Sequence, residues 1–124
     1  MEDRDPLTGA VIAAAIEVHR EMGPGLLESV YQACLEYELR VRGIECLPLH
    51  KLPLVYKGVT LKDEFVIDVF FPGRLIVELK AVEKIIGVHE AQLLTYMKLT
   101  KSPVGLLLNF HMPVLRDGIK RMVL

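Results

Sequence analysis

The sequence predicts an α/β fold, in which a mixed β-sheet is flanked by helices in the order ααβββαβ(β). Three observations lead to this prediction. Residues 5–42 carry apolar side chains at helical spacing, and residues 45–81 form short apolar runs separated by proline and glycine. The uninterrupted apolar run at residues 104–110 is typical of a strand covered on both faces. A chain of 124 residues is long enough for one core, so we expect residues 1–124 to form a single domain.

Two helices are expected at the start of the chain. Asp5 stands before a proline, which is the pattern of an N-cap followed by proline at the first helical position. A first helix should then run to about Met22, where glycine and proline at residues 23–25 end it. A second helix is expected over residues 26–42, with Gly43 as its stop.

The middle of the chain is predicted to form strands, since β-branched and aliphatic residues dominate its short runs. The runs lie at residues 45–51, 54–56, 59–71 and 75–81, and the predicted order counts three strands among them. A third helix should cover residues 88–100, between a glycine and a proline. The apolar run at 104–110 and a final, edge-like strand at 119–124 complete the sheet.

Composition excludes several classes of protein. The net charge is −1, so any contact with phosphates has to come from a local cluster of cations. No apolar stretch has the length of a membrane-spanning helix, and the charged start argues against a signal peptide. Cys34 and Cys46 lack the spacing of a metal or disulfide framework, which favours reduced thiols in a cytoplasmic protein, with Cys34 packed in the core. The high apolar content suggests a partner, such as a second copy of the chain.

Two carboxylates lie within or beside apolar runs. Asp68 sits inside the run at 65–71, and Glu78 follows the run at 75–77. Carboxylates are costly in such places unless they are paired or bound to a cation. If the two runs pair as a hairpin across residues 72–74, Asp68 and Glu78 can converge on one cation. Lys80 would point the same way as Glu78, because alternate residues of a strand share a face.

These residue types suit a divalent-metal hydrolytic site. Mg²⁺ takes carboxylate oxygens and water, often with only one or two carboxylates from the protein. Asp68 and Glu78 would supply these, with the carbonyl oxygen of Leu79 as a further ligand. Lys80 could polarise an attacking water or neutralise charge that develops on a phosphodiester. The alternative is that Glu78 and Lys80 are solvated residues at a strand end.

The third helix adds His89, Gln92 and Tyr96, whose spacing puts them on one face. This face could look into the same cleft, where Gln92 or Tyr96 would orient a water or touch a phosphate. Alternatively, it faces solvent or packs under the sheet. The start of the helix resembles the zinc-protease pattern HExxH, but Leu93 stands where the second histidine is needed, so that interpretation fails.

The second helix begins with another carboxylate. Glu28 and Tyr31 are i, i+3 neighbours after Gly25. Glu28 could complement the helix dipole, or it could be a third carboxylate of the metal site. The chain contains no GxSxG elbow, P-loop or dinucleotide glycine pattern, which removes several common enzyme classes.

Taken together, these motifs resemble a known family. Residues 25–31, 77–83 and 89–96 are similar to the small prokaryotic GxxExxY family, a branch of the PD-(D/E)XK nuclease superfamily. The likeness extends from about residue 12 to residue 110. It implies a restriction-endonuclease-like core and a divalent-metal site.

The resemblance also implies roles for individual residues. Asp68 matches the motif aspartate, and Glu78 and Lys80 match the (D/E)xK pair. Glu28 matches a helical glutamate that often precedes the core, and Gln92 matches the polar residue on the helix that follows it. The sequence departs from the pattern in having isoleucine rather than proline before Asp68.

Three functions remain open at this point. The first is a nuclease that uses Mg²⁺ or Mn²⁺ to cleave DNA or RNA, and that forms a homodimer or needs a partner to grip its substrate. The second is a catalytically silent nuclease-fold module that binds nucleic acid or a protein. The third is a metal-dependent hydrolase of small phosphorylated molecules. No membrane association is expected.

Overall fold

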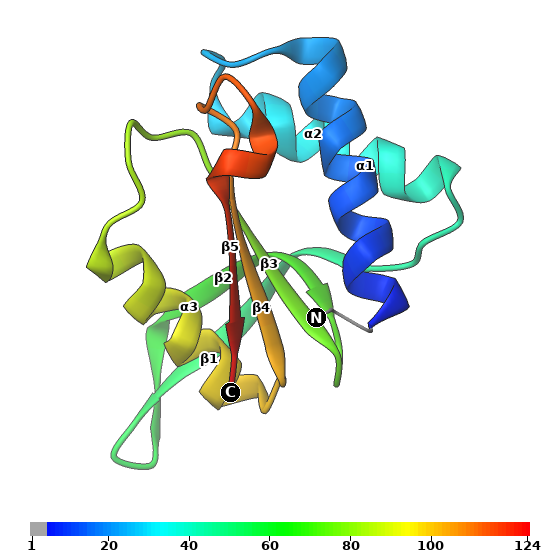
Figure 1. The fold of residues 1–124 in the computed structure, drawn as a ribbon. Coiled ribbons are helices and arrows are strands. Elements are labelled where there is room, and N and C mark those ends of the chain that lie inside the picture. The colour runs from blue at the N-terminus through cyan, green and yellow to red at the C-terminus, as the bar shows by residue number, and fades with distance from the viewer. Residues whose placement is uncertain (1–4) are drawn as a thin grey trace.

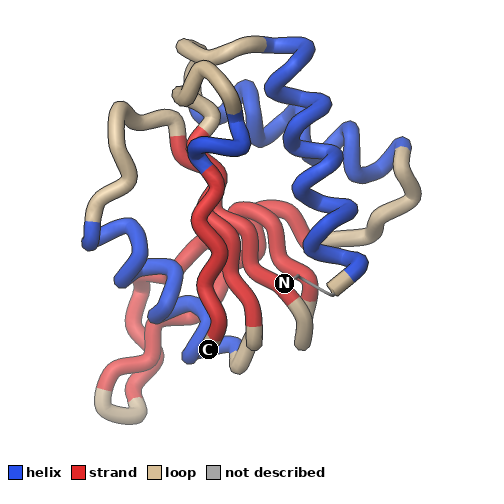
Figure 2. Tube along the Cα trace, viewed as in Figure 1, coloured by secondary structure: helices blue, strands red, loops and turns tan. Residues whose placement is uncertain are grey.

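A five-stranded sheet lies between helices on its two faces (Figures 1 and 2). The computed structural model describes residues 5–124. The order of elements confirms the predicted α/β fold. The elements are α1 Pro6–Met22, α2 Glu28–Val41, β1 Leu47–Tyr56, β2 Val59–Phe71, β3 Leu75–Lys80, α3 Gly87–Thr100, β4 Val104–Asn109, a 3₁₀ turn Leu115–Gly118 and β5 Ile119–Val123.

The strands follow one another across the sheet in chain order, from β1 to β5. The central pair, β3 and β4, is parallel, and every other neighbouring pair is antiparallel. The parallel pair needs a crossover, which α3 supplies. Because β3 and β4 lie in the middle of the sheet with helices on both faces, nearly all of their side chains are buried.

Two hydrophobic cores hold the layers together. On one face, α1 and α2 pack against side chains that include Val77 and Leu79. On the other face, α3 packs against a second cluster that includes Ile76. Since side chains alternate along a strand, Glu78 and Lys80 extend from β3 on the same side as Ile76, which is the side of α3.

The two short runs at residues 45–51 and 54–56 form a single strand, so three strands lie between α2 and α3, as the predicted order has it. This strand, β1, contains Pro48 and Pro53. Proline cannot donate a ladder hydrogen bond, but β1 is the edge of the sheet and needs partners on one side only. A shift of register between Pro53 and Val55 accommodates the second proline.

Tyr31 fixes the turn that joins the first two helices. Its hydroxyl donates to the carbonyl oxygen of Gly23 at 2.6 Å and accepts from the N–H of Leu26 at 3.1 Å. Its ring is fully buried and stacks on Phe110, with 4.6 Å between the ring centroids. The start of α2, and with it the position of Glu28, is therefore anchored to the core by one side chain.

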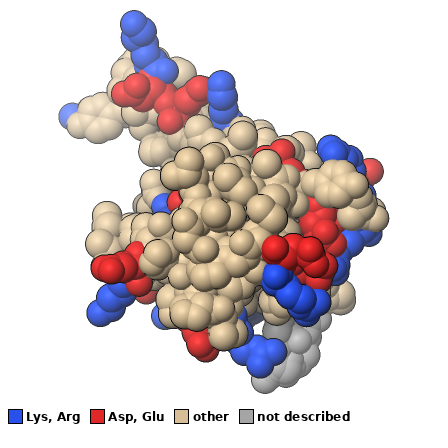
Figure 3. Space-filling view, turned by 90° about the horizontal axis from the view of Figure 1, so that it is seen from above, with Lys and Arg blue, Asp and Glu red and all other residues tan. Residues whose placement is uncertain are grey.

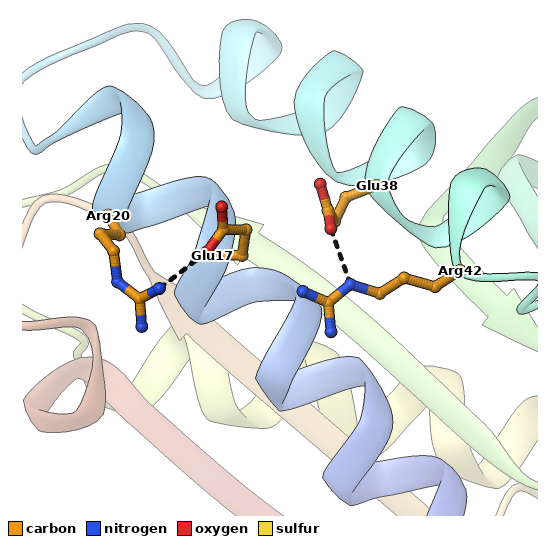
Figure 4. A network of polar contacts seen from close by, with 4 residues as sticks. All are labelled: Glu17, Arg20, Glu38 and Arg42. Atoms are coloured by element: carbon orange, nitrogen blue, oxygen red, sulfur yellow. Dashed lines mark hydrogen bonds and ion pairs between the residues drawn. The ribbon is translucent and has the colours of Figure 1, made fainter.

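Charged residues beside the groove between α1 and α2 form two ion pairs (Figure 4). Glu17 pairs with Arg20 at 2.9 Å, and Glu38 pairs with Arg42 at 2.7 Å. Such exposed pairs contribute little to stability. No helix within residues 5–124 is both long and apolar enough to cross a membrane.

Replacing Tyr31 by phenylalanine is expected to lower the free energy of unfolding by about 1–2 kcal/mol, because a buried donor and acceptor lose their partner while the ring stack remains. Urea unfolding monitored by circular dichroism measures the change. Tyr37→Phe is the matched control, since Tyr37 lies on the same helix but is 58% exposed. Equal stability of the two variants would contradict the anchoring role of the Tyr31 hydroxyl.

Candidate functional site

Where the main-chain pairing of β2 and β3 ends, side chains form the hydrogen bonds that connect the two strands. Main-chain pairing between these strands reaches as far as Val69 and Val77. Beyond that point, the N–H of Asp68 donates to Oε2 of Glu78 at 3.2 Å. The N–H of Leu79 in turn donates to Oδ2 of Asp68 at 2.8 Å. Each carboxyl group thus binds the backbone of the opposite strand, which fixes both groups side by side.

At Asp68, the side chains of β2 switch from one face of the sheet to the other. Ile67 packs in the cluster beneath α3, whereas Val69, two residues along, packs against α1 and α2. Residues two apart in a regular strand share a face, so the backbone is distorted between them. On the neighbouring strand, Leu49 has a φ of +48°, which is uncommon for leucine, and it lies opposite Asp68 between two regular pairs. The distortion therefore centres on the aspartate that the sequence singled out.

Burial makes the two carboxyl groups share a proton. Glu78 is 4% exposed, and burial raises its pKa to about 9, with a further upward contribution from the charge of Asp68. Burial also raises the pKa of Asp68, while hydrogen bonds from Leu79 N–H and from the Glu78 carboxyl act to lower it. Because the pKa of Glu78 lies above neutral pH, Glu78 keeps its proton there and can share it with the neighbouring carboxyl group of Asp68.

Glu28 and Lys80 extend this cluster. Glu28 is exposed, but its carboxyl group accepts a hydrogen bond from the N–H of Ala81, directly after β3. Burial and the charge of Asp68 raise the pKa of Glu28, and the Lys80 ammonium lowers it. The same ammonium lowers the pKa values of Asp68 and Glu78. Lys80 therefore lies within electrostatic reach of all three carboxyl groups.

The three polar residues predicted on one face of α3 lie in different environments. Tyr96 is buried and meets Phe65 edge-on, with 5.7 Å between the ring centroids. Burial raises its pKa, and so do the charges of Glu78 and Asp68, which places its ring beside the pair. Gln92, one turn earlier, is exposed. His89 uses Nδ1 to accept the N–H of Ile86 at 3.0 Å, at the start of the helix.

Two supporting residues escaped the sequence analysis. Asn109 is buried at the end of β4, where its side chain accepts from Val82 N–H at 3.1 Å and donates to the Val82 carbonyl at 2.8 Å. It thereby holds the segment that follows Lys80. Gln32 is buried on α2, one helical turn after Glu28, and bonds to the Asp68 carbonyl. Asn109 could have been identified from the sequence as a polar residue inside an apolar run. For Gln32, the sequence offered only its position one helical turn after Glu28.

The donors at this site fit a hard divalent cation. Carboxylate and carbonyl oxygens are the ligands that Mg²⁺ takes, and it keeps several waters of its own. Two carboxyl groups that must share a proton when metal-free can accept a cation in place of that proton. Among residues 5–124, no three His, Cys, Asp or Glu side chains cluster closely enough to hold a metal ion. An ion here would thus depend on Asp68, Glu78 and oxygens from the backbone and water.

The structure thus sets Asp68 of β2 against Glu78 and Lys80 at the end of the antiparallel neighbour β3, on a mixed sheet flanked by helices. The comparison with protein families agrees with this geometry. The model of the PD-(D/E)XK nuclease superfamily matches residues 5–122, and the chain belongs to this superfamily. Comparisons with curated proteins and with solved structures give no match.

The metal-free protein is expected to lose stability as the pH rises. Glu78 has an ordinary pKa of 4.5 and a folded pKa of about 9, so the folded state keeps a proton that the unfolded state releases. The stability from this proton is fully present below about pH 4.5 and is lost as the pH rises towards 9. Thermal unfolding in EDTA at pH 5, 7 and 9 measures the effect.

Glu78→Gln is the control for this pH series. Glutamine keeps an oxygen that can accept the Asp68 N–H but does not titrate. Its unfolding temperature should depend less on pH between 5 and 9 than that of the wild type. Parallel pH profiles of the two proteins would contradict the shared proton.

Proposed function

We propose that this protein is a divalent-metal-dependent nuclease that hydrolyses phosphodiester bonds of DNA or RNA. The observation that carries the proposal is the contact between the Asp68 and Glu78 carboxyl groups, buried on adjacent strands with Lys80 beside them. Superfamily membership supports the reaction class. The metal requirement and the substrate are inferred from the chemistry of the residues.

Each residue has a role that follows from its position. Asp68, Glu78 and the carbonyl oxygen of Leu79 would hold Mg²⁺ or Mn²⁺, which supplies a water of lowered pKa and stabilises the leaving oxygen. Lys80 extends from the same side of β3 as Glu78, so its ammonium can orient the attacking water or neutralise charge on the phosphate. Glu28, hydrogen-bonded at the end of β3, can hold a water at the edge of the site.

Helix α3 would contribute to substrate contact. The hydroxyl of Tyr96 lies beside the carboxyl pair and can donate a hydrogen bond to a phosphate oxygen or a water. Gln92 is exposed one turn towards the start of the helix, which is the end that follows β3. It can therefore reach a bound nucleic acid without being part of the buried site. His89 supports the first turn of the helix.

We also assign the chain to the GxxExxY branch of the superfamily. Gly25 has a φ of +95°, a conformation that favours glycine, in the turn before α2. Tyr31 binds this turn through its hydroxyl, and Glu28 is the first residue of the helix between them. The spacing of these three residues thus has a physical purpose: the glycine and the tyrosine shape the turn that presents the glutamate.

The surface suggests that substrate is gripped locally and with a partner. In the view of Figure 3, cations and anions lie next to one another around a largely uncharged centre, and no single-sign basic field covers that face. The β1–β2 hairpin carries exposed apolar side chains, which would be covered in a homodimer. These include Val55, Tyr56, Val59 and Leu61. The free cysteines fit a reducing, cytoplasmic setting.

A catalytically silent module is the second candidate. It is favoured by the finding that no third ligating side chain joins the pair within the described part of the chain. Calorimetric titration with Mn²⁺ separates the two candidates. Heat of binding at one site that disappears in Glu78→Gln supports the enzyme, whereas nucleic-acid binding with no Mn²⁺ binding and no turnover supports the module.

Cleavage of labelled DNA and RNA with Mg²⁺ or Mn²⁺ tests the enzyme directly. We expect Asp68→Asn, Glu78→Gln and Lys80→Met each to lower the rate by on the order of 100-fold or more, because each removes a charge from the reacting centre. EDTA should stop cleavage by the wild type. Lys84→Met is the matched control, since Lys84 is exposed four residues after Lys80, and it should retain most of the activity.

Cleavage at the same rate by the wild type and all three site variants would mean that a contaminant is responsible. Turnover of free nucleotides without any affinity for polynucleotides would instead point to a hydrolase of small phosphorylated molecules. Both outcomes would remove the proposed function.

A further inference from the structure

One amide side chain connects α2 to the backbone of the candidate site. Nε2 of Gln32 donates to the carbonyl oxygen of Asp68 at 2.8 Å and to Oε2 of Glu36 at 2.8 Å. Both N–H bonds of this amide are therefore used, and the bond to Glu36 fixes the orientation of the amide group. Gln32 is only 8% exposed, so water competes poorly for either bond.

The peptide that Gln32 holds lies within the distorted stretch of β2. The N–H of Asp68 donates to Glu78, and the carbonyl of Asp68 accepts from Gln32. Side chains from β3 and α2 therefore bind the two peptide groups on either side of the Asp68 Cα. Between these two backbone groups lies the Cα that carries the carboxyl group. The direction of the carboxyl group, and its bond to Leu79 N–H, therefore depends on how these two peptide groups are oriented.

We propose that Gln32 is a positioning residue for the Asp68 carboxylate, which it holds in the orientation that lets Asp68 and Glu78 bind one cation. The proposal rests on the proposed function for the identity of the cation. Gln32 is not proposed as a ligand, because its amide N–H groups bind the carbonyl of Asp68 and the carboxyl group of Glu36. Without the amide, this carbonyl loses its donor and the distorted peptide can relax towards regular strand geometry.

Gln32→Met tests the proposal, because methionine keeps the length and burial of the side chain but has no N–H donor. We expect Mn²⁺ affinity, measured by calorimetry, to fall about tenfold or more, as is usual when a residue that orients a metal ligand is removed. Glu36→Gln is the conservative control. It keeps an oxygen that accepts from Gln32, so its Mn²⁺ affinity should stay close to that of the wild type.

Leu35→Ala separates positioning from general stability. Leu35 is fully buried on the same helix, next to Gln32, and its truncation weakens the packing of α2 through an apolar side chain. Its unfolding temperature should fall at least as far as that of Gln32→Met, while Mn²⁺ affinity stays near the wild-type value. Equal losses of Mn²⁺ affinity in the two variants would reduce Gln32 to a packing role and overturn the proposal.

Amide hydrogen exchange in the metal-free protein gives a second measurement that does not depend on the proposed function. In Gln32→Met, the N–H of Leu79 should exchange faster, because its acceptor on Asp68 has moved, whereas the N–H of Val77 should be unchanged. If the wild type binds no Mn²⁺, the proposed function fails and this comparison alone decides the role of Gln32. Unchanged exchange at Leu79 in that case, or unchanged Mn²⁺ affinity in a metal-binding protein, would overturn the proposal.

Discussion

The site depends on two carboxyl groups that the fold holds in contact beneath a helix. Such contact is unfavourable, because burial and mutual repulsion both oppose ionisation. The structure offsets part of this cost by giving Asp68 and Glu78 backbone N–H donors from the opposite strand and by placing the Lys80 ammonium within electrostatic reach. The shared proton offsets more of it. Hydrophobic residues at these positions would suit stability better, so folding alone does not account for the pair.

The N-terminal helices serve this pair from the far face of the sheet. Tyr31 sets the turn from which Glu28 projects, and Gln32 binds the Asp68 carbonyl. Both residues lie on α2, so one helix places a carboxylate at the rim of the site and supports the aspartate from behind. On the other side of β3, the Asn109 side chain forms hydrogen bonds with the backbone of the segment after Lys80 and fixes its position. The charges are thus fixed by hydrogen bonds to the backbone as well as by packing.

Sequence reasoning predicted the features that follow from local periodicity. Alternation along β3 placed Glu78 and Lys80 on one side, and the turn at residues 72–74 predicted the hairpin that brings Asp68 beside them. Sequence reasoning could not predict that the side chains of β2 switch faces at Asp68, because the same run of apolar residues is compatible with a regular or a distorted strand. The contact of Gln32 was equally hidden, since it spans 36 positions. Similarly, spacing grouped Gln92 with Tyr96, but only the packing of α3 shows that Tyr96 alone is buried.

The proton on Glu78 connects the close approach of the two carboxyl groups with the proposed binding of a cation. If both carboxyl groups bind the proposed cation, Glu78 has to release this proton, so cation binding and deprotonation would be coupled. The coupling favours binding at higher pH, where the metal-free protein is least stable, and a bound cation would restore the stability that ionisation removes. The distortion at Asp68 fits the same logic, because it brings the Asp68 carboxyl group against β3 at the expense of regular strand pairing. A strand that kept regular pairing through Asp68 would be better folded and would have no site.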